Sequence, residues 1–220
     1  VAQHRKVIIV PHDPELPVVI VGGGPAGIFS GLLLARAGVK VTVLEKHEDF
    51  FRDFRGDTVH PATLDLFHQL GWLDELLALE HSKVDTLGMR IAGRERKLAD
   101  FRHLAVPAPF IAMMPQWDLL DFLSRKAKQY PGFELRMGAE AVAAHADEAG
   151  RIDSVQIAGG EILPAQLVIA ADGRRSIMRD QAQLPVDGRV LAAIDGAGAV
   201  NLHVVGVRPH RHGEAAGRSH

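Results

Sequence analysis

Three glycines at a spacing that suits phosphate binding form the most informative motif of the chain. Gly22, Gly24 and Gly27 give the pattern GxGxxG, with Pro25 and Ala26 between the last two. We expect Gly22 to permit a tight turn, Gly24 to let the backbone approach a pyrophosphate, and Gly27 to let a helix pack closely on a strand. Free amides at the helix start then face the anion. Pro25, which has no amide proton, suits the first helical turn, and we place Pro25 and Ala26 in the same candidate site.

An acidic side chain follows at the distance that a bound ribose requires. Glu45 stands 23 positions after Gly22, at the end of a predicted strand, and Lys46 comes next. A carboxylate there accepts hydrogen bonds from an adenosine ribose and repels a 2′-phosphate, which disfavours NADP in this pocket. We therefore place Glu45 and Lys46 in the cofactor site.

Two arginines and a glutamine have two interpretations each. Arg52 and Arg55 lie in a polar predicted loop, residues 47–60, at the carboxyl edge of the sheet. A guanidinium there grips a phosphate or is simply solvated. Gln116 begins a predicted helix, where its amide is a ligand contact or only a helix-start residue.

The elements that position these residues follow from the pattern. Val18–Val21 is a β-branched run, residues 25–37 have helical spacing closed by Gly38, and residues 39–44 form a second strand. A glycine-rich turn in another α/β protein is one alternative. A membrane span is another, since residues 16–35 carry no charge, although five glycines and two prolines argue against it.

The remaining chain predicts helices and short strands. We expect helices over 61–70, 72–79 and 116–130, strands of a smaller sheet over 84–110 and 110–114, and a three-stranded meander over 133–171. The apolar run 167–171 is typical of a strand buried on both faces and returns to the parallel sheet. Asp172 and Gly173 follow it directly, with Ser176 and Arg179 on a new helical turn.

Composition points to small-molecule partners. Among 220 residues, 47% are hydrophobic, the net charge is -2 and basic and acidic residues are mixed, so no basic stripe for nucleic acid is present. The absence of cysteine excludes disulfides and thiolate metal sites and is compatible with a cytoplasmic location. Residues 1–15 are interpreted as an N-terminal extension without signal-peptide character.

Two separated motifs together resemble a known family. GGGPAG with Glu45, and LVIAADGRRSIMR with Asp172 and Gly173, are similar to the FAD-dependent aromatic-ring monooxygenases related to p-hydroxybenzoate hydroxylase. The segments FRGDTVHPATLDLFHQLG and MPQWDLLDFL also resemble that family, in order. The resemblance implies an α/β fold: a Rossmann-like FAD-binding domain with a parallel sheet, a β-meander and part of a smaller mixed sheet.

The same resemblance implies roles for the site residues. The glycine motif surrounds the FAD pyrophosphate and Glu45 holds the adenosine ribose, while Arg55 and Gln116 touch FAD, Arg55 near the pyrophosphate. Asp172 and Gly173 lie beside the phosphate region of the flavin. In such enzymes NADPH or NADH reduces the flavin and an oxygen atom passes to an activated ring, so the chemistry belongs to the cofactor and no catalytic base is named.

The end of the chain departs from that family. A third flavin motif, a Gly-Asp pair, has no counterpart, and residues 186–220 hold no aromatic side chain. We therefore divide the chain into the extension 1–15, an FAD-binding domain with part of the substrate-side sheet over 16–182, and an atypical tail over 183–220. That tail is frameshifted or disordered under the hypothesis that the protein is C-terminally truncated. His210 and His212 are too weak a pair to predict a metal site.

Three functions remain open from the sequence. The first is an NAD(P)H-dependent flavin monooxygenase acting on an aromatic or related small molecule. The second is an NAD-dependent dehydrogenase with the same first βαβ unit, which would not need the Asp172–Gly173 turn. The third is a truncated, non-catalytic FAD-binding remnant.

Overall fold

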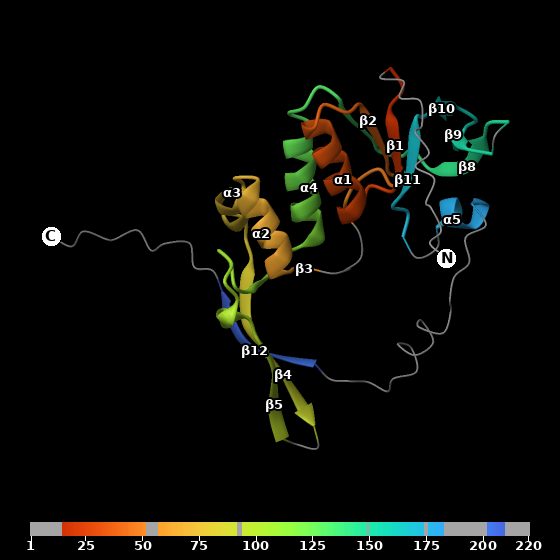
Figure 1. Ribbon diagram of the computed structural model, residues 1–220. Helices are drawn as coiled ribbons and strands as arrows, with labels where there is room; N and C mark the ends of the chain where they lie inside the picture. The colour runs from red at the N-terminus through yellow and green to blue at the C-terminus, as the bar shows by residue number, and fades with distance from the viewer. Residues whose placement is uncertain are drawn as a thin grey trace, which may run out of the picture. The chain divides into compact units, whose positions relative to one another are not determined.

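The computed structural model describes residues 15–51, 57–91, 94–148, 150–173, 176–182 and 202–209, with only the backbone for 90, 91 and 202–209. The chain forms two compact units (Figure 1). The first combines Val1–Asp49 with Leu123–Pro185, and the second combines Phe50–Phe122 with Val186–His220. Each unit is described by itself.

A parallel sheet organises the first unit. Its strands are β1 (Val18–Val21), β2 (Val41–Leu44), β7 (Phe133–Arg136) and β11 (Leu167–Ala170), in the order β11-β1-β2-β7. Every pairing is parallel, so the carboxyl ends of all four strands share one edge. The βαβ opening predicted from the sequence is thus confirmed.

Helix α1 (Pro25–Arg36) packs on one face of this sheet (Figure 1). A Cβ added to Gly31 would lie 2.7 Å from Val43 Cγ2 and 3.0 Å from the Phe133 ring, which shows how closely helix and sheet approach. Gly38, at φ 85°, ends the helix in the left-handed conformation that was expected of it.

The opposite face is covered by the predicted meander. Strands β8 (Ala141–Ala146), β9 (Ile152–Ile157) and β10 (Ile162–Pro164) form an antiparallel sheet in the order β10-β9-β8. Its apolar side chains share a buried cluster with Val19, Val21 and Leu44 of the parallel sheet. Short helix α5 (Ile177–Gln181) joins that cluster through Met178.

Strand β11 corrects one prediction. It returns to the parallel sheet as expected, but it is not buried on both faces: Leu167 is 52% exposed and Ala170 is also exposed. Within the described residues β11 pairs only with β1 and lies at the edge of the sheet. The apolar run correctly predicts a strand of the parallel sheet. The burial of its side chains depends instead on neighbouring strands and helices from elsewhere in the chain.

The second unit contains an antiparallel sheet with two helices. Strands β3 (Thr58–Val59), β4 (Ser82–Ile91), β6 (Ile111–Met113) and β12 (Leu202–Pro209) follow the order β12-β4-β6-β3, and β5 (Arg94–Asp100) pairs with β4. Helices α2 (Pro61–Gln69) and α3 (Leu73–Leu77) precede β4. Phe67 and Phe122 meet edge to face, with ring centroids 5.9 Å apart, in the core of this unit.

Helix α4 (Gln116–Ala127) contains the boundary between the two units. It begins at the residue predicted from the sequence and is shorter than expected at its end. Strand β12 lies within residues 183–220, the segment that the sequence analysis separates as an atypical tail.

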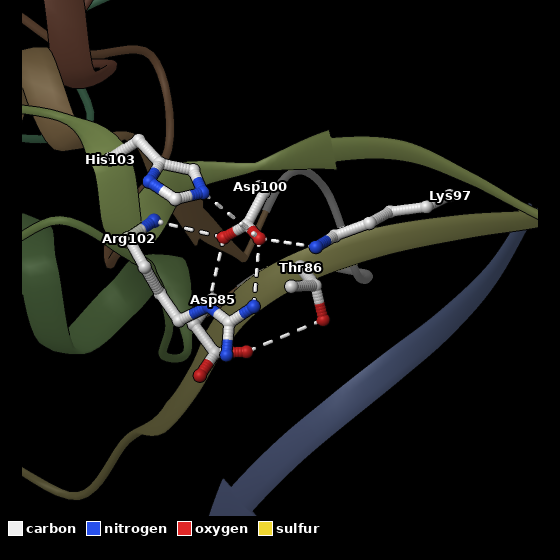
Figure 2. A network of polar contacts seen from close by, with 6 residues as sticks. All are labelled: Asp85, Thr86, Lys97, Asp100, Arg102 and His103. Carbon is white, nitrogen blue, oxygen red and sulfur yellow. Dashed lines mark hydrogen bonds and ion pairs between the residues drawn. The ribbon is translucent and has the colours of Figure 1, made fainter.

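A polar cluster surrounds the Asp100 carboxylate where β5 meets the short 3-10 helix Phe101–His103 (Figure 2). Arg102 donates to both carboxylate oxygens, at 2.9 and 2.7 Å, and Lys97 donates to one of them. His103 Nε2 is 3.6 Å from the same carboxylate. The Arg102 and Lys97 hydrogen bonds hold the pKa of Asp100 well below its usual range.

No helix in the part of the chain that the structure describes is long and apolar enough to cross a membrane. The uncharged stretch 16–35 divides into β1, the glycine turn and most of α1.

Candidate functional site

Packing explains two of the three motif glycines and leaves the third unexplained. Gly22 has φ 109°, and a Cβ added to it would lie 2.3 Å from the Ala171 carbonyl oxygen. A Cβ on Gly27 would lie 1.8 Å from the carbonyl oxygen of Gly22. Gly24 differs, because its φ is an ordinary -75° and, apart from its chain neighbours, no atom of the described residues lies within 4 Å of an added Cβ. The space beside Gly24 is therefore open to a ligand.

The start of α1 offers backbone donors toward this space. Gly24 is the N-cap residue and provides no side-chain hydrogen bond to the helix, and no acidic residue occupies the first turn. Pro25 and Ala26 are both exposed. Amides at a helix N-terminus carry partial positive charge and bind anions such as phosphate.

Glu45 fastens the glycine turn to the end of β2. The residue is only 3% exposed, and its Oε2 accepts a hydrogen bond from the Gly23 backbone amide at 2.9 Å. Its Oε1 accepts from the His47 amide at 3.0 Å. The sequence predicted a ribose acceptor here and missed this bracing role, which no spacing rule signals. The role of Glu45 toward a ribose stays a prediction. Lys46 is exposed.

The turn after β11 meets the glycine turn, although the two motifs are far apart in sequence. A Cβ on Gly22 would lie 2.9 Å from the Asp172 amide nitrogen, so the two turns touch. Gly173 adopts φ 84°. Asp172 Oδ2 accepts from the Met178 amide at 3.3 Å, whereas Oδ1 is buried and has no hydrogen-bond partner among the residues that the structure describes. A buried acceptor without a donor is costly unless a ligand supplies one.

The serine predicted to begin a helical turn after Asp172 caps helix α5. Ser176 is buried, and its Oγ accepts a hydrogen bond from the Arg179 amide at 3.0 Å. The side chain of Gln181 then ties the helix to β8, accepting from the Ala144 amide and donating to the Val142 carbonyl. The Asp172 turn is thus held between a parallel strand and a docked helix.

The remaining predicted contacts lie in the other unit or outside the described residues. Gln116 begins α4 in the second unit, and its backbone amide donates a hydrogen bond to Asp57 Oδ1 at 3.3 Å. Sequence reasoning did not single out Asp57. Arg52 and Arg55 lie outside the described residues, as do His210 and His212. The structure therefore brings together Gly22, Gly24, Gly27, Glu45 and Asp172 in one unit.

Comparison with known proteins gives monooxygenases and a reductase among the relatives of this chain. The chain is 32% identical over 173 residues to 6-methylpretetramide 4-monooxygenase of Streptomyces rimosus, covering 77% of this chain and 41% of that protein. It is 34% identical over 165 residues to menaquinone reductase of Mycobacterium tuberculosis, covering 74% and 39%. The crystal structure of p-nitrophenol 4-monooxygenase PnpA from Pseudomonas putida superposes with a TM-score of 0.67, at 26% identity, over 78% of this chain and 44% of that one.

These matches confirm the resemblance to flavin-dependent aromatic monooxygenases and the Rossmann-like α/β fold. The chain spans about two fifths of the length of the two curated relatives. The model of a family described as "FAD binding domain" matches residues 15–216, which is nearly the whole sequence. With its glycine turn, buried acid and Asp-Gly turn assembled as described above, the protein belongs to this family of FAD-binding domains.

Proposed function

We propose that this chain is the FAD-binding part of an NAD(P)H-dependent flavin monooxygenase that hydroxylates an aromatic or related small molecule. The proposal rests on a contrast among the three motif glycines. A Cβ added to Gly22 or Gly27 would clash with the backbone, whereas a Cβ added to Gly24 would meet no atom of the described residues beyond its chain neighbours. Protein packing does not require glycine at position 24, whereas a pyrophosphate lying against the backbone does. The chain covers about two fifths of its relatives, so the activity proposed is that of a whole protein of this kind.

The residues present fit FAD. A dinucleotide needs amide donors for its phosphates, which the N-terminus of α1 supplies, because the Gly22 and Gly23 amides already donate to the Leu44 carbonyl and to Glu45. It also brings hydroxyl groups, and Asp172 Oδ1 is a buried acceptor for which the described part of the chain provides no donor. We assign the phosphates to Gly22, Gly24, Pro25, Ala26 and Gly27. The assignment continues with Glu45 and Lys46 at the adenosine ribose, and with Asp172, Gly173, Arg55 and Gln116 as further contacts.

Bound FAD would supply electron transfer and the reaction with oxygen. The protein's residues bind and orient it: Glu45 fixes the glycine turn, and the capped α5 fixes the Asp172 turn. A carboxylate at position 45 repels a 2′-phosphate, so NADPH, if it is the reductant, would bind elsewhere. A cytoplasmic location and a small-molecule partner complete the proposal, supported by the lack of cysteine and the mixed charge.

The test is the substitution Gly24→Ala in the full chain. The methyl group of alanine fits the open space beside position 24. Replacing an N-cap glycine by alanine should lower the free energy of unfolding by about 1 kcal/mol or less. We expect the FAD dissociation constant to rise at least about tenfold, roughly 1.4 kcal/mol, because the methyl group occupies the phosphate approach. Flavin fluorescence titration and urea unfolding of the FAD-free chain measure the two effects. Unchanged FAD affinity would remove the observation on which the proposal rests.

A reductase is the second candidate, because menaquinone reductase is as similar to this chain as the monooxygenase relative. Oxygen isotope labelling separates the two chemistries: a monooxygenase incorporates one atom of labelled oxygen into its product, whereas a reductase transfers electrons to a quinone without oxygen. An NAD titration tests the dehydrogenase alternative. Saturable FAD binding without NADPH oxidation would identify a binding part that needs the rest of a longer protein.

A further inference from the structure

Asp57 lies where the backbone of the second unit holds it firmly. Its carbonyl oxygen accepts a hydrogen bond from the Met114 amide at 2.9 Å. The next residue begins β3, which pairs with β6 in the register Thr58 opposite Met113. Two successive residues of this segment are thus tied to the strand that leads into α4, and the Asp57 side chain is half-buried beside the start of that helix.

Helix α4 needs an acceptor at its start that its own sequence does not provide. Pro115 directly precedes the helix, and its carbonyl accepts a hydrogen bond from the Asp118 amide at 3.1 Å. Pro115 is therefore the N-cap residue of α4. A proline side chain has no acceptor for the free amides of the first turn. Asp57 Oδ1 supplies one to the Gln116 amide at 3.3 Å, from 59 positions away. The negative charge of this carboxylate also interacts favourably with the positive N-terminal end of the dipole of the 12-residue helix.

A second contact holds the same helical turn. The Phe51 ring lies against the Trp117 ring, with centroids 5.0 Å apart and planes inclined at 40°. Phe51 and Asp57 therefore contact consecutive residues, Trp117 and Gln116, of one turn. The position of that turn is fixed from outside the helix by one aromatic and one charged contact.

We propose that Asp57 is a positioning residue, which holds the Gln116 end of α4 in the geometry that FAD binding requires. The inference rests on the proposed function, because only that function assigns Gln116 to FAD. Asp57 acts through the backbone amide of Gln116 and does not itself touch the cofactor.

The first experiment is a double-mutant cycle on FAD affinity in the full chain, with D57A, Q116A, the double variant and D57N. We expect D57A to raise the FAD dissociation constant about tenfold, the size typical of a lost hydrogen bond to a charged group. D57N keeps an oxygen acceptor and should stay within about threefold of the original chain. In the Q116A background D57A should add less than about twofold, because both act through one contact.

Asp65 offers a matched control in the same unit. Its carboxylate also accepts a hydrogen bond, at 2.8 Å from Gln69 Nε2, but on an exposed face of α2. D65A should leave FAD affinity unchanged. Equal losses in D57A and D57N, additive losses in the double variant, or no loss in D57A would each overturn the positioning role.

Hydrogen exchange of the Gln116 amide tests the contact without FAD. We expect exchange in the FAD-free chain to be about tenfold faster in D57A than in the original chain or D57N. Unchanged exchange overturns the inference even if FAD binds. A chain that binds no FAD overturns the proposed function and with it the role toward FAD, while faster exchange in D57A would still establish that Asp57 holds the start of α4.

Discussion

Glu45 in the first unit and Asp100 in the second are both carboxylates with little exposed surface, 4% and 11% of their side chains. Their main hydrogen-bond partners differ. Glu45 accepts hydrogen bonds from the backbone amides of Gly23 and His47, which belong to two different loops. Asp100 accepts mainly from the side chains of Arg102 and Lys97, each about half exposed (Figure 2), and at the longer distance of 3.3 Å from the Arg102 backbone amide, which lies at an exposed position.

The difference decides what each carboxylate can do. A backbone amide cannot turn away, so losing Glu45 leaves the buried Gly23 amide without a partner, which costs more than the hydrogen bond itself contributes. Exposed guanidinium and ammonium groups turn to water when their partner is lost, and such surface pairs contribute little. We therefore expect the first unit to hold a ligand in a fixed geometry, and the Asp100 cluster to stabilise its hairpin only weakly.

The largest effect on stability is expected at Gly27, which lies against the carbonyl oxygen of Gly22 in the same turn. The change Gly27→Ala would place a methyl group 1.8 Å from the Gly22 carbonyl, a backbone atom that can move only with the whole turn. We expect a loss of about 3 kcal/mol or more in the free energy of unfolding, at the upper end of overpacking effects. FAD binding should be lost as well, as measured by urea unfolding and flavin titration.

Gly31 on the same helix provides the control. Its added Cβ would meet the side chains of Val43 and Phe133, which can shift by rotation. Gly31→Ala should cost only about 1 to 2 kcal/mol of stability and leave FAD affinity unchanged. If both variants lose FAD binding equally, the backbone of the turn is not what the site depends on.

An intermediate effect is expected for Glu45→Gln. Glutamine has one acceptor oxygen, so its NH2 group must face either the Gly23 or the His47 amide, donor against donor. We expect stability to fall by about 1 to 3 kcal/mol and FAD affinity to weaken by a similar amount, through the turn and through the lost ribose acceptor. Thermal unfolding and FAD titration measure the two quantities.

Glu134 is the matching carboxylate with a side-chain partner in the same unit, accepting from Thr42 Oγ1 at 2.9 Å. Glu134→Gln should change stability by about 1 kcal/mol or less, because the amide oxygen replaces the acceptor. A Glu45→Gln variant as stable as Glu134→Gln would contradict the importance assigned to backbone partners.

Local signals in the sequence were sufficient for the first βαβ unit. The β-branched run at Val18, Pro25 in the first helical turn and Gly38 after the last each report a short-range preference, and each element forms where predicted. The Asp172–Gly173 turn was found in the same way, because it directly follows an apolar run that predicts a strand. The roles of the site residues toward FAD stay predictions.

Contacts between distant segments could not be predicted in this way. The Glu45 carboxylate meets the Gly23 amide, and Asp57 meets Gln116, only because separate strands are brought side by side. The exposure of Leu167 likewise depends on the place of its strand in the sheet and not on its own apolar sequence. The proposed division at residues 15 and 182, and the frameshift hypothesis for the tail, stay predictions too, although the family match extends to residue 216.

The smallest effect is expected for Asp100→Asn, and its pH dependence follows from the direction of the pKa shift. The pKa of Asp100 in the folded protein lies below its ordinary value of 3.8. The cluster therefore stabilises the fold at every pH above that ordinary value, and its contribution is lost as the pH falls below it. We expect the thermal unfolding temperature of the variant to lie slightly below that of the original chain at pH 7, and the gap to narrow as the pH falls from about 5 to 2.

Salt distinguishes the two carboxylates a second time. In 1 M salt the screening length falls to about 3 Å, so the small gap caused by Asp100→Asn should shrink, because Arg102 and Lys97 are half exposed. The gap caused by Glu45→Gln should persist, since the hydrogen bond of Glu45 to the Gly23 amide is buried and is screened much less. If both gaps shrink alike, Glu45 stabilises the glycine turn mainly by long-range charge, and a neutral acceptor could replace it without loss of geometry.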